Sequence, residues 1–384
     1  MNAGRCLVFI GPERTDARSV KRIAAFTAQG WRVTGFTFYR DRGQADPPPV
    51  WDNIPLGTTY NRRYLHRVWA IVRAFGIIFQ HRRRLREAAA LYVINPDNAL
   101  LGLFGRFVCR RRVPVVVEIA DIQPAMTGTG LVARGLRFLE RFVLRRSQLL
   151  VTTSPGFLRH YFEPVQRYRG PVFLLENKVY PSASLIAART SRAAPVKPGR
   201  WTIGYFGVFR CERSIELITR LAAVFPDKLA FVLRGVPAGL DETFFRKKIS
   251  DHSNIEYGGP YHYPGDLPAI YGGVDFNWCF DFSAAGANSA WLLPNRLYEG
   301  GLFHCPALAF AGTETAAWIT GNGCGEAFSE HLFTQLHAFF RSLTLERWQV
   351  LATGCRGAPD ERFAGESDYA VLSERLLALA PASD

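Results

Sequence analysis

The residues best suited to chemistry lie in one short segment of the last third of the chain, residues 294–301. Its sequence, PNRLYEGG, opens an expected helix and carries Asn295, Arg296 and Glu299. A carboxylate can accept hydrogen bonds from both hydroxyls of a diol, and an arginine can bind two phosphate oxygens at once. These residue types could together bind a ligand that carries a diol and phosphate groups. The alternative is a solvated helix glutamate.

A second group of residues follows an expected strand at 202–206. Gly207 lets a ligand approach the backbone closely, and Arg210 and Arg213 lie just beyond it. Cations and backbone N–H groups can hold a diphosphate and stabilise its charge as it leaves. We expect Gly207 and Arg210 to share a site with Arg296. Arg213 fits a surface charge equally well.

A third candidate, Asp121, follows an apolar run at 115–119. In a parallel sheet this position lies at the carboxyl end of a strand, where ligands bind. A carboxylate there can take a proton from an attacking hydroxyl as a general base, or it can orient the molecule that carries the hydroxyl. The alternative is a structural role in which the Asp121 side chain closes a turn.

The sequence has no metal-binding pattern. It contains no Asp-x-Asp pair and no His/Cys set with ligand spacing. We therefore expect no metal site and no cofactor, with arginines and backbone N–H groups taking the place of a cation at the diphosphate.

The elements that must position these residues alternate between apolar strands and helical patterns. Such alternation is typical of parallel sheets with helices on both faces. The expected strands form two series, at 6–10, 32–39, 90–94, 113–119, 149–153 and 172–175, and at 202–206, 229–233, 254–257, 275–280 and 306–310. Residues 181–200, rich in Pro, Ser and Ala, lie between the two series and predict a linker.

Residues 294–325 resemble the donor-binding segment of bacterial glycosyltransferases of the two-Rossmann GT-B architecture, particularly the family-4 type. In that family a helix carries a glutamate, a proline seven residues later starts a strand, and a Gly–Glu turn and a glycine loop follow. Glu299 and Pro306 have that separation here. The stretches at 202–210, 139–141 and 151–154 are similar, more weakly, to other parts of the family's two domains.

The resemblance implies an α/β, GT-B fold, with two Rossmann-like domains whose parallel sheets face a central cleft. Residues 1–180 would form an acceptor-binding domain, 181–200 a linker, 201–365 a donor-binding domain and 366–384 a C-terminal helix. Glu299 would bind the ribose of a nucleotide diphosphate sugar. The expected activity is metal-independent hexosyl transfer to a lipid-linked or growing saccharide acceptor in bacterial exopolysaccharide, capsule or lipopolysaccharide synthesis.

The chain departs from the family pattern at one position. Family-4 enzymes typically carry a second carboxylate eight residues before the helix glutamate, and Trp291 stands there instead. A residue like Asp121 occurs in inverting exopolysaccharide transferases of the same architecture. The sequence therefore leaves open whether the transfer retains or inverts the anomeric configuration, and an inactive GT-B scaffold is a competing interpretation.

Positive charge is concentrated in the first half of the chain. Of the net charge of +14, residues 1–180 contribute +17 and residues 181–384 contribute −3. Such asymmetry predicts an anionic partner, namely a membrane surface, a phosphorylated substrate or a nucleic acid, and its alternative is a solvated arginine-rich surface. Because no nucleic-acid-reading module is recognisable, a nucleic-acid-binding protein is a secondary interpretation and no nucleic-acid partner is expected.

One basic segment, residues 61–88, has apolar side chains at helical spacing between clusters of arginine. This pattern predicts an amphipathic helix on an anionic membrane surface, or else a core-packed helix with a solvated basic end. The expected membrane contacts are Arg62, Arg63, Arg67, Arg82, Arg83 and Arg84.

Two further features bear on location. No apolar run reaches the roughly 18 residues of a spanning helix, and the seven cysteines are scattered without a pairing pattern, which fits a reducing compartment. We expect a cytoplasmic protein, peripheral at the inner face of the plasma membrane. A nicotinamide-dependent dehydrogenase is disfavoured because GPERTD, not G-x-G-x-x-G, follows the first strand.

Overall fold

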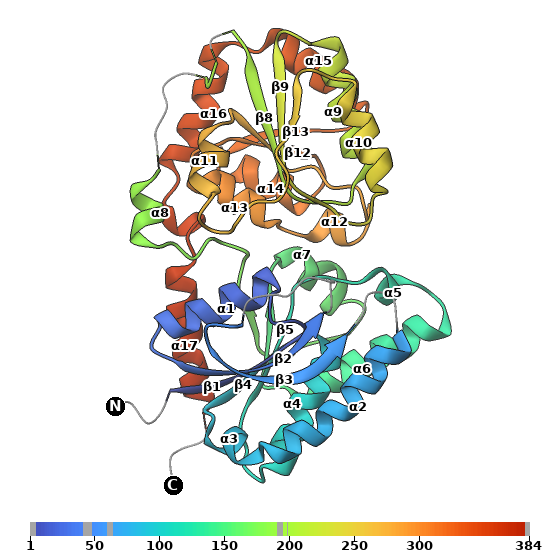
Figure 1. Cartoon of the computed structure of the whole chain (residues 1–384), viewed down its shortest axis with the longest axis vertical. Helices are drawn as coiled ribbons and strands as arrows, with labels where there is room; N and C mark the ends of the chain where they lie inside the picture. The colour runs from blue at the N-terminus through green and yellow to red at the C-terminus, as the bar shows by residue number, and fades with distance from the viewer. Residues whose placement is uncertain (1–4, 41–47, 60–63, 190–194, 198, 381–384) are drawn as a thin grey trace. The chain divides into compact units, whose positions relative to one another are not determined.

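The computed structural model describes residues 5–40, 48–59, 64–189, 195–197 and 199–380. The chain forms two compact units, one combining Met1–Leu175 with Glu366–Asp384 and the other spanning Glu176–Gly365 (Figure 1). The change of unit falls at 175/176, five residues before the expected end of the first domain. The segment expected as a linker, 181–200, belongs to the second unit, and the C-terminal helix belongs to the first.

The first unit is built on a seven-stranded parallel sheet with the order β3-β2-β1-β4-β5-β6-β7. Its strands are β1 (Cys6–Gly11), β2 (Arg32–Arg40), β3 (Asp52–Thr59), β4 (Ala90–Ile94), β5 (Val115–Ile119), β6 (Leu149–Thr152) and β7 (Val172–Leu174). Strands β4, β5 and β6 are buried along their whole length, as expected for a parallel sheet covered on both faces.

The helices of the first unit connect these strands. They are α1 (Ala17–Ala28), α2 (Tyr64–Gln80), α3 (Arg82–Glu87), α4 (Pro96–Val108), α5 (Pro124–Thr127), α6 (Leu131–Arg146), α7 (Pro155–Phe157), the π-helix Leu158–Phe162 and α17 (Glu366–Leu379).

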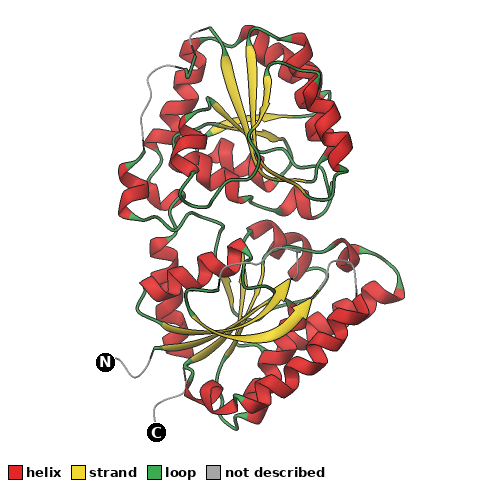
Figure 2. Cartoon of the chain, in the orientation of Figure 1, coloured by secondary structure: helices red, strands yellow, loops and turns green. Residues whose placement is uncertain are grey.

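Helices cover both faces of this sheet (Figure 2). Tyr92 and Val93 point to opposite faces, because strand side chains alternate. Phe26 of α1 packs edge-on against Tyr92 and against Tyr369 of α17, with ring centroids 5.1 and 5.7 Å apart. On the other face α4 approaches Val93 closely at Gly102, and α2 and α6 both pack against α4. The C-terminal helix is therefore part of the first unit's core.

A buried ion pair fixes α1 and α17 to the sheet of the first unit. The Arg22 guanidinium donates to both carboxylate oxygens of Glu118 at 2.9–3.2 Å, and Tyr92 and Tyr369 complete the cluster. Burial alone would raise the pKa of Glu118, but Arg22 beside it holds that pKa below its ordinary value. A buried charge needs such a partner, because removing one member leaves the other uncompensated.

The second unit has a six-stranded parallel sheet with the order β10-β9-β8-β11-β12-β13. Its strands are β8 (Trp201–Phe209), β9 (Leu229–Pro237), β10 (Ile255–Tyr257), β11 (Phe276–Trp278), β12 (Ala307–Phe310) and β13 (Gly325–Phe328). The core is strongly aromatic and includes the ring cluster of Trp201, Phe276, Trp348 and Phe340. The expected α/β fold class with two Rossmann-like units is confirmed.

The helices of the second unit are mostly short. They are α8 (Ala183–Ala187), α9 (Glu212–Val224), α10 (Glu242–Ser250), α11 (Leu267–Gly272), α12 (Asn288–Trp291), α13 (Asn295–Leu302), α14 (Glu314–Gly321), α15 (Leu332–Ser342), α16 (Leu345–Gly357) and the 3-10 helix Asp360–Arg362.

Three elements differ from the sequence-based expectation. Strand β3 was not expected because it contains Pro55 and Gly57, which are tolerated at the edge position that it occupies. Strand β13 starts at Gly325, inside the expected glycine loop; a Cβ on Gly325 would lie 2.0 Å from the Ala307 carbonyl oxygen, so glycine is required there. The helix expected at 61–88 is two helices, α2 and α3, which are separated at His81.

Candidate functional site

The strand order of the second unit reverses between β8 and β11. In open parallel sheets, ligands bind outside the carboxyl ends of the strands at such a point. Arg210 directly follows β8, and Asp281 lies three residues beyond β11. The two side chains form an ion pair there, with Arg210 Nη2 3.4 Å from Asp281 Oδ2. Topology therefore places the candidate site at this edge of the second unit's sheet.

Two glycines shape the backbone at this edge. Gly207 of β8 has a φ of +108° and is the register partner of Gly235 of β9, whose φ is +147°. A Cβ on Gly235 would lie 1.7 Å from the Gly207 carbonyl oxygen, so no other residue fits between the two backbones. A Cβ on Gly207 would meet no atom within 4 Å. There is consequently open space beside the Gly207 backbone.

Glu299 is held inside the same unit by a tyrosine that the sequence motifs did not indicate. It lies in α13 with only 4% of its surface exposed, and the Tyr271 hydroxyl of α11 donates to its Oε2 at 3.0 Å. Burial and the charge of Glu299 raise the pKa of Tyr271 well above its ordinary value. The phenol therefore keeps its proton and fixes the orientation of the carboxylate.

Arg296 lies under the strand that leads to Gly207. Its Nη1 donates to the Phe206 carbonyl oxygen at 3.1 Å, and its guanidinium lies 5.0 Å from the centroid of the Tyr205 ring. The residue is 9% exposed, and its Nε has no hydrogen-bond partner among the described residues. Burial by itself lowers the pKa of Arg296, but Tyr205 and Cys279 raise it above its ordinary value. Arg296 thus places a permanent positive charge next to this backbone.

Asp281 is a residue of this site that the sequence reasoning missed. Its Oδ1 accepts hydrogen bonds from the Ser283 backbone N–H at 2.9 Å and from the Ser289 hydroxyl at 3.1 Å, while Arg210 contacts Oδ2. Burial alone would raise the pKa of Asp281, but Arg296 and Ser283 hold it below its ordinary value. Its position after β11 was the available signal. Over the described residues, no three His, Cys, Asp or Glu side chains are placed to hold a metal ion.

The other expected donor-site residues lie nearer the surface. Arg213, in the first turn of α9, is exposed and stacks over the Phe282 ring at 4.3 Å. Asn295 is exposed at the first position of α13, and Trp291 is half-buried at the end of α12. The structure therefore gathers Gly207, Arg210, Arg296 and Glu299 around the switch point. It gives Arg213 an aromatic partner.

A loop beyond strand β10 approaches the same carboxylate. Tyr261 is half-buried, and burial together with the charge of Glu299 raises its pKa above the ordinary value. Arg296 acts on Tyr261 in the opposite direction. The segment 258–261 thus lies within electrostatic reach of both charged residues of α13.

Asp121 lies in the first unit, at the carboxyl end of β5. Its half-exposed carboxylate forms an ion pair with Arg18 of α1, with Arg18 Nη2 2.9 Å from Oδ2. Burial lowers the pKa of Arg18, but Asp121 and Glu118 raise it above its ordinary value. Arg18, which the sequence motifs did not indicate, therefore fixes the position of the Asp121 side chain.

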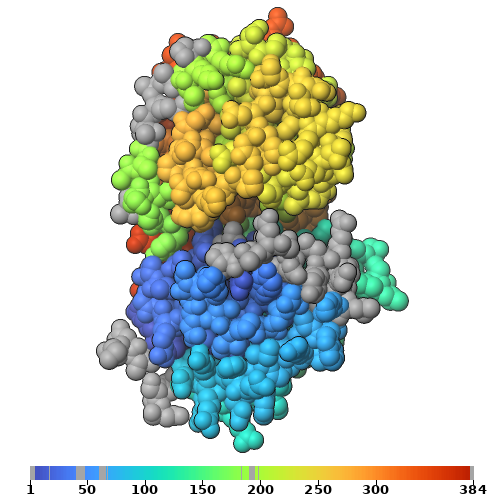
Figure 3. Space-filling view, in the orientation of Figure 1, coloured from blue at the N-terminus to red at the C-terminus, as the bar shows by residue number. Residues whose placement is uncertain are grey.

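The expected membrane contacts are described in part. Arg62 and Arg63 lie outside the described residues, and Arg67 lies within α2. Arg82, Arg83 and Arg84 are exposed on α3, where Arg84 pairs with Asp52 at 2.8 Å and Arg82 stacks over Phe79 at 4.6 Å. The atoms of α2 and α3 form part of the blue-to-cyan surface of the first unit (Figure 3). Among the described helices, none is long and apolar enough to cross a membrane.

Residues 17–178 match the family model described as a glycosyl transferase 4-like domain. The chain is 33% identical over 321 residues to the succinoglycan biosynthesis protein ExoL of Rhizobium meliloti, covering 83% of this chain and 80% of the relative.

Solved structures with the same fold include HepE from Anabaena in complex with UDP and glucose. That match has a TM-score of 0.70 at 13% identity and covers 97% of this chain and all of the other. Sucrose-phosphate synthase from Thermosynechococcus elongatus matches with a TM-score of 0.68 at 14% identity, covering 98% and 99%. The lipopolysaccharide outer core galactosyltransferase WaaB matches with a TM-score of 0.61 at 10% identity, covering 96% and 99%.

Proposed function

The chain belongs to the glycosyl transferase 4-like family of GT-B glycosyltransferases, and from this premise we propose that it transfers a hexose from a nucleoside diphosphate sugar to a lipid-linked or growing saccharide acceptor. The second unit would bind the donor and the first unit the acceptor. The observation that carries the proposal is the buried carboxylate of Glu299, which Tyr271 orients beside Arg296 at the switch point of the second sheet.

Glu299 is proposed to bind the ribose of the donor. A carboxylate can accept two hydroxyl hydrogen bonds, and the Tyr271 hydroxyl occupies Oε2 from the protein side. Fixing the carboxylate in advance spares the ordering cost when the diol binds. The segment 258–261, whose half-buried Tyr261 is affected by the charge of Glu299, is the proposed neighbour of the nucleobase.

The diphosphate is proposed to lie beside Gly207. The open space at its backbone admits phosphate oxygens, Arg210 and Arg213 are exposed enough to reach them, and Arg296 adds a buried charge. These groups would stabilise the charge that develops as the nucleoside diphosphate leaves. The sequence has no Asp-x-Asp pair, so we propose that the arginines perform this task without a metal ion.

Asp281 is proposed to position the Arg210 side chain for the diphosphate. Its carboxylate, fixed by Ser283 and Ser289, forms an ion pair with Arg210. A diphosphate carries more charge than the single carboxylate and can accept a forked contact from arginine, whereas Asp281 makes a single contact with Arg210. We propose that Arg210 exchanges part of its contact with Asp281 for the donor.

The acceptor hydroxyl is proposed to be activated by Asp121, either as general base or as the residue that orients the acceptor. Arg18 keeps the Asp121 carboxylate at the carboxyl end of β5 in either role. Whether the configuration is retained or inverted depends on which role applies, and Trp291 in place of the family's second carboxylate removes the usual sugar contact.

The biological setting is proposed from the relatives. ExoL is named for succinoglycan biosynthesis, and HepE was solved with UDP and glucose, so a UDP-sugar in bacterial exopolysaccharide synthesis is the first combination to test. The basic helices α2 and α3 would hold the enzyme at the cytoplasmic face of the inner membrane, where a lipid-linked acceptor lies. A catalytically inactive scaffold, suggested by Trp291, is the competing interpretation.

The experiment is calorimetric titration of UDP and UDP-glucose into the wild-type chain, Glu299→Ala and the control Glu216→Ala. Glu216 is an exposed glutamate of α9 in the same unit. We expect Glu299→Ala to weaken UDP binding at least tenfold, because the ribose loses two hydrogen bonds, and Glu216→Ala to bind normally. Equal affinities for all three proteins would reject the ribose assignment. No binding of any nucleoside diphosphate by the wild type would favour the scaffold.

A further inference from the structure

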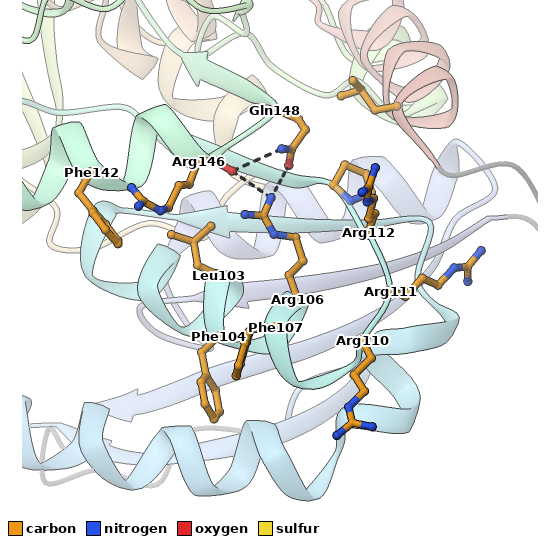
Figure 4. A pocket seen from close by; sticks show the side chains of 12 residues that line it. Leu103, Phe104, Arg106, Phe107, Arg110, Arg111, Arg112, Phe142, Arg146 and Gln148 are labelled. Carbon is orange, nitrogen blue, oxygen red and sulfur yellow. Dashed lines mark hydrogen bonds between the residues drawn. The ribbon is translucent and has the colours of Figure 1, made fainter.

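A groove of about 890 Å³ opens on the first unit where α4 and α6 end. Both helices lead into the first residues of strands, β5 and β6, so the groove lies at the amino edge of the sheet, opposite the edge that carries Asp121. Five arginines line it: Arg106, Arg110, Arg111, Arg112 and Arg146 (Figure 4). No part of the proposed transfer reaction uses this groove.

The positive charge of the groove is uncompensated. Within the described part of the chain, none of these five arginines pairs with a carboxylate, in contrast to Arg18, Arg22 and Arg210. Arg106 instead donates to the Arg146 carbonyl oxygen at 2.9 Å and to Gln148 Oε1 at 3.1 Å. Burial and the neighbouring Arg146 lower the pKa of Arg106. An anion in the groove would relieve this repulsion.

Helix electrostatics account for only part of this cluster. Arg106 and Arg146 lie in the last turns of α4 and α6, where a cation stabilises the helix dipole by roughly 0.3–1 kcal/mol. Arg110, Arg111 and Arg112 lie in the loop beyond α4, where Arg111 donates to the Arg86 carbonyl oxygen in the last turn of α3 at 2.7 Å. The loop adds three charges to a surface that already carries two.

Aromatic side chains line the same groove. Phe107 has 79% of its surface exposed, and Phe142 lies under the Arg146 guanidinium at 3.8 Å. A groove that combines arginines with exposed rings suits an amphiphile, in which an anionic phosphate group adjoins an apolar chain. A soluble anion would leave Phe107 in water.

The exposed apolar surface continues along the helices that form the groove. Helices α2, α4 and α6 are neighbours in one layer, and each runs antiparallel to the strands, so their first residues lie at the carboxyl edge of the sheet. Leu131, at the start of α6, has 81% of its surface exposed, and Val132, Phe138 and Trp69 are exposed as well. Exposed apolar residues therefore occur along this helix layer from one edge of the sheet to the other.

We propose that the groove binds the headgroup phosphates of anionic phospholipids and that the α2–α4–α6 layer lies against the bilayer. The arginines would contact phosphate groups, and Phe107 with the exposed apolar residues of α6 would enter the interfacial region. The proposal deepens the membrane-peripheral part of the proposed function and rests on it. Because the layer reaches the edge that carries Asp121, a lipid-linked acceptor in the same bilayer would meet the first unit there.

A second, smaller groove supports the same assignment. It lies on the other side of the α6 C-terminus and is lined by Arg141, Arg145, Arg167 and Arg169. The two basic grooves flank one helix end and together form a broad positively charged surface at the amino edge of the sheet. An anionic membrane surface requires such a broad contact. A nucleic acid would use the charge but not the exposed apolar residues of α6.

The test is flotation of the full chain with vesicles of phosphatidylcholine alone and with 30% phosphatidylglycerol. The groove variant is Arg110→Gln/Arg112→Gln/Arg146→Gln, and its matched control is Arg246→Gln/Lys247→Gln/Lys248→Gln on the exposed face of α10, which removes the same charge from the second unit. Three surface cations should account for about a hundredfold in partition onto anionic vesicles. We expect that loss for the groove variant, less than threefold for the control, and a several-fold loss for Phe107→Ser.

Three results would overturn the proposal. The groove variant could bind anionic vesicles as well as its control does. Inorganic phosphate at constant ionic strength could displace the wild type completely from vesicles, which would assign the groove to a soluble anion. A random DNA duplex could bind more tightly than the vesicles and lose affinity in the groove variant, which would assign it to nucleic acid. UDP titration of each variant keeps the outcomes separate, because the groove variants are expected to bind donor normally whether or not they bind lipid.

Discussion

Replacing Gly235 by alanine tests whether the contact between β8 and β9 shapes the candidate donor site. Gly235 has a φ of +147°, and its Cβ would lie 1.7 Å from the Gly207 carbonyl oxygen. Both obstacles are backbone features, so no rotamer change can relieve them. The variant must move the β8 backbone at the point where the diphosphate is proposed to bind.

The cost can be worked out from the two effects separately. A backbone held in such a conformation costs of order 1–3 kcal/mol for a residue with a Cβ. Contacts between heavy atoms are optimal at about 3.5–4.0 Å, so 1.7 Å demands a shift of more than 1 Å, and overpacking of this kind costs typically 1–3 kcal/mol. We expect Gly235→Ala to destabilise the second unit by about 2–6 kcal/mol, the sum of the two effects, and to weaken UDP binding at least tenfold.

Two other glycines supply the controls. Gly207 and Gly57 have φ values of +108° and +120°, but a Cβ on either would meet no atom within 4 Å. Gly207→Ala and Gly57→Ala should therefore lose stability only by the conformational cost of about 1–3 kcal/mol. Gly57→Ala should bind UDP normally, whereas the Cβ of Gly207→Ala would enter the space proposed for the diphosphate and weaken UDP binding. Urea unfolding followed by fluorescence measures stability, and calorimetry measures UDP affinity. If Gly235→Ala matched Gly57→Ala in both measurements, the reasoning from the close contact would be refuted.

Three further variants test the roles of Asp121, of helix α3 and of Glu140. Asp121→Asn should lower turnover at least a hundredfold while sparing UDP affinity, as expected for loss of a general base, and near-normal turnover would remove it from the reaction. Replacing Arg82, Arg83 and Arg84 of α3 with glutamine should reduce flotation with anionic vesicles, and full retention would exclude α3 as a membrane contact. Burial raises the pKa of Glu140 to about 7, although Tyr161 and Gln166 donate hydrogen bonds to it. Because the folded state then binds a proton more tightly than the unfolded chain, the free energy of unfolding should fall by about 3 kcal/mol between pH 4.5 and pH 7 and change little above pH 7. Glu140→Gln should flatten this part of the stability–pH profile. An unchanged slope in that variant would contradict the assignment to Glu140.

Most of the fold could be predicted from the alternation of strand and helix patterns in the sequence. Eleven strands were expected, and those missed, β3 and β13, are the ones whose pattern is weakest. Pro55 and Gly57 interrupt the strand pattern of β3. Gly325 interrupts the pattern of β13, and glycine is required there because a Cβ would collide with the Ala307 carbonyl oxygen. Local patterns do not reveal such contacts, since they depend on which strand lies alongside.

The candidate site could be predicted in part for a similar reason. Glu299, Arg296 and Gly207 belong to contiguous motifs that the sequence displays. Tyr271 and Arg18 come from other helices and reach Glu299 and Asp121 only after folding. The spacing of residues along the sequence does not predict such partners, because they lie far apart in the chain.

Two aspartates show the same limit. Asp275 and Asp281 lie six residues apart, at the two ends of the strand expected at 275–280. In the structure Asp275 accepts hydrogen bonds from the Val196 and Thr202 backbone N–H groups, a structural task, whereas Asp281 lies at the switch point with Arg210. Both residues are buried polar groups, and the one difference that the sequence offers is that Asp281 follows the carboxyl end of the strand, where ligands bind.

The most direct test of the central claim is transfer itself. The purified chain is incubated with radiolabelled UDP-glucose, and then with other nucleoside diphosphate hexoses, together with a lipid-linked acceptor fraction from bacterial membranes. We predict label in the organic-extractable product, and loss of that label in Glu299→Ala and in Asp121→Asn. A wild-type chain that binds a nucleoside diphosphate sugar but transfers no label from any donor would contradict it.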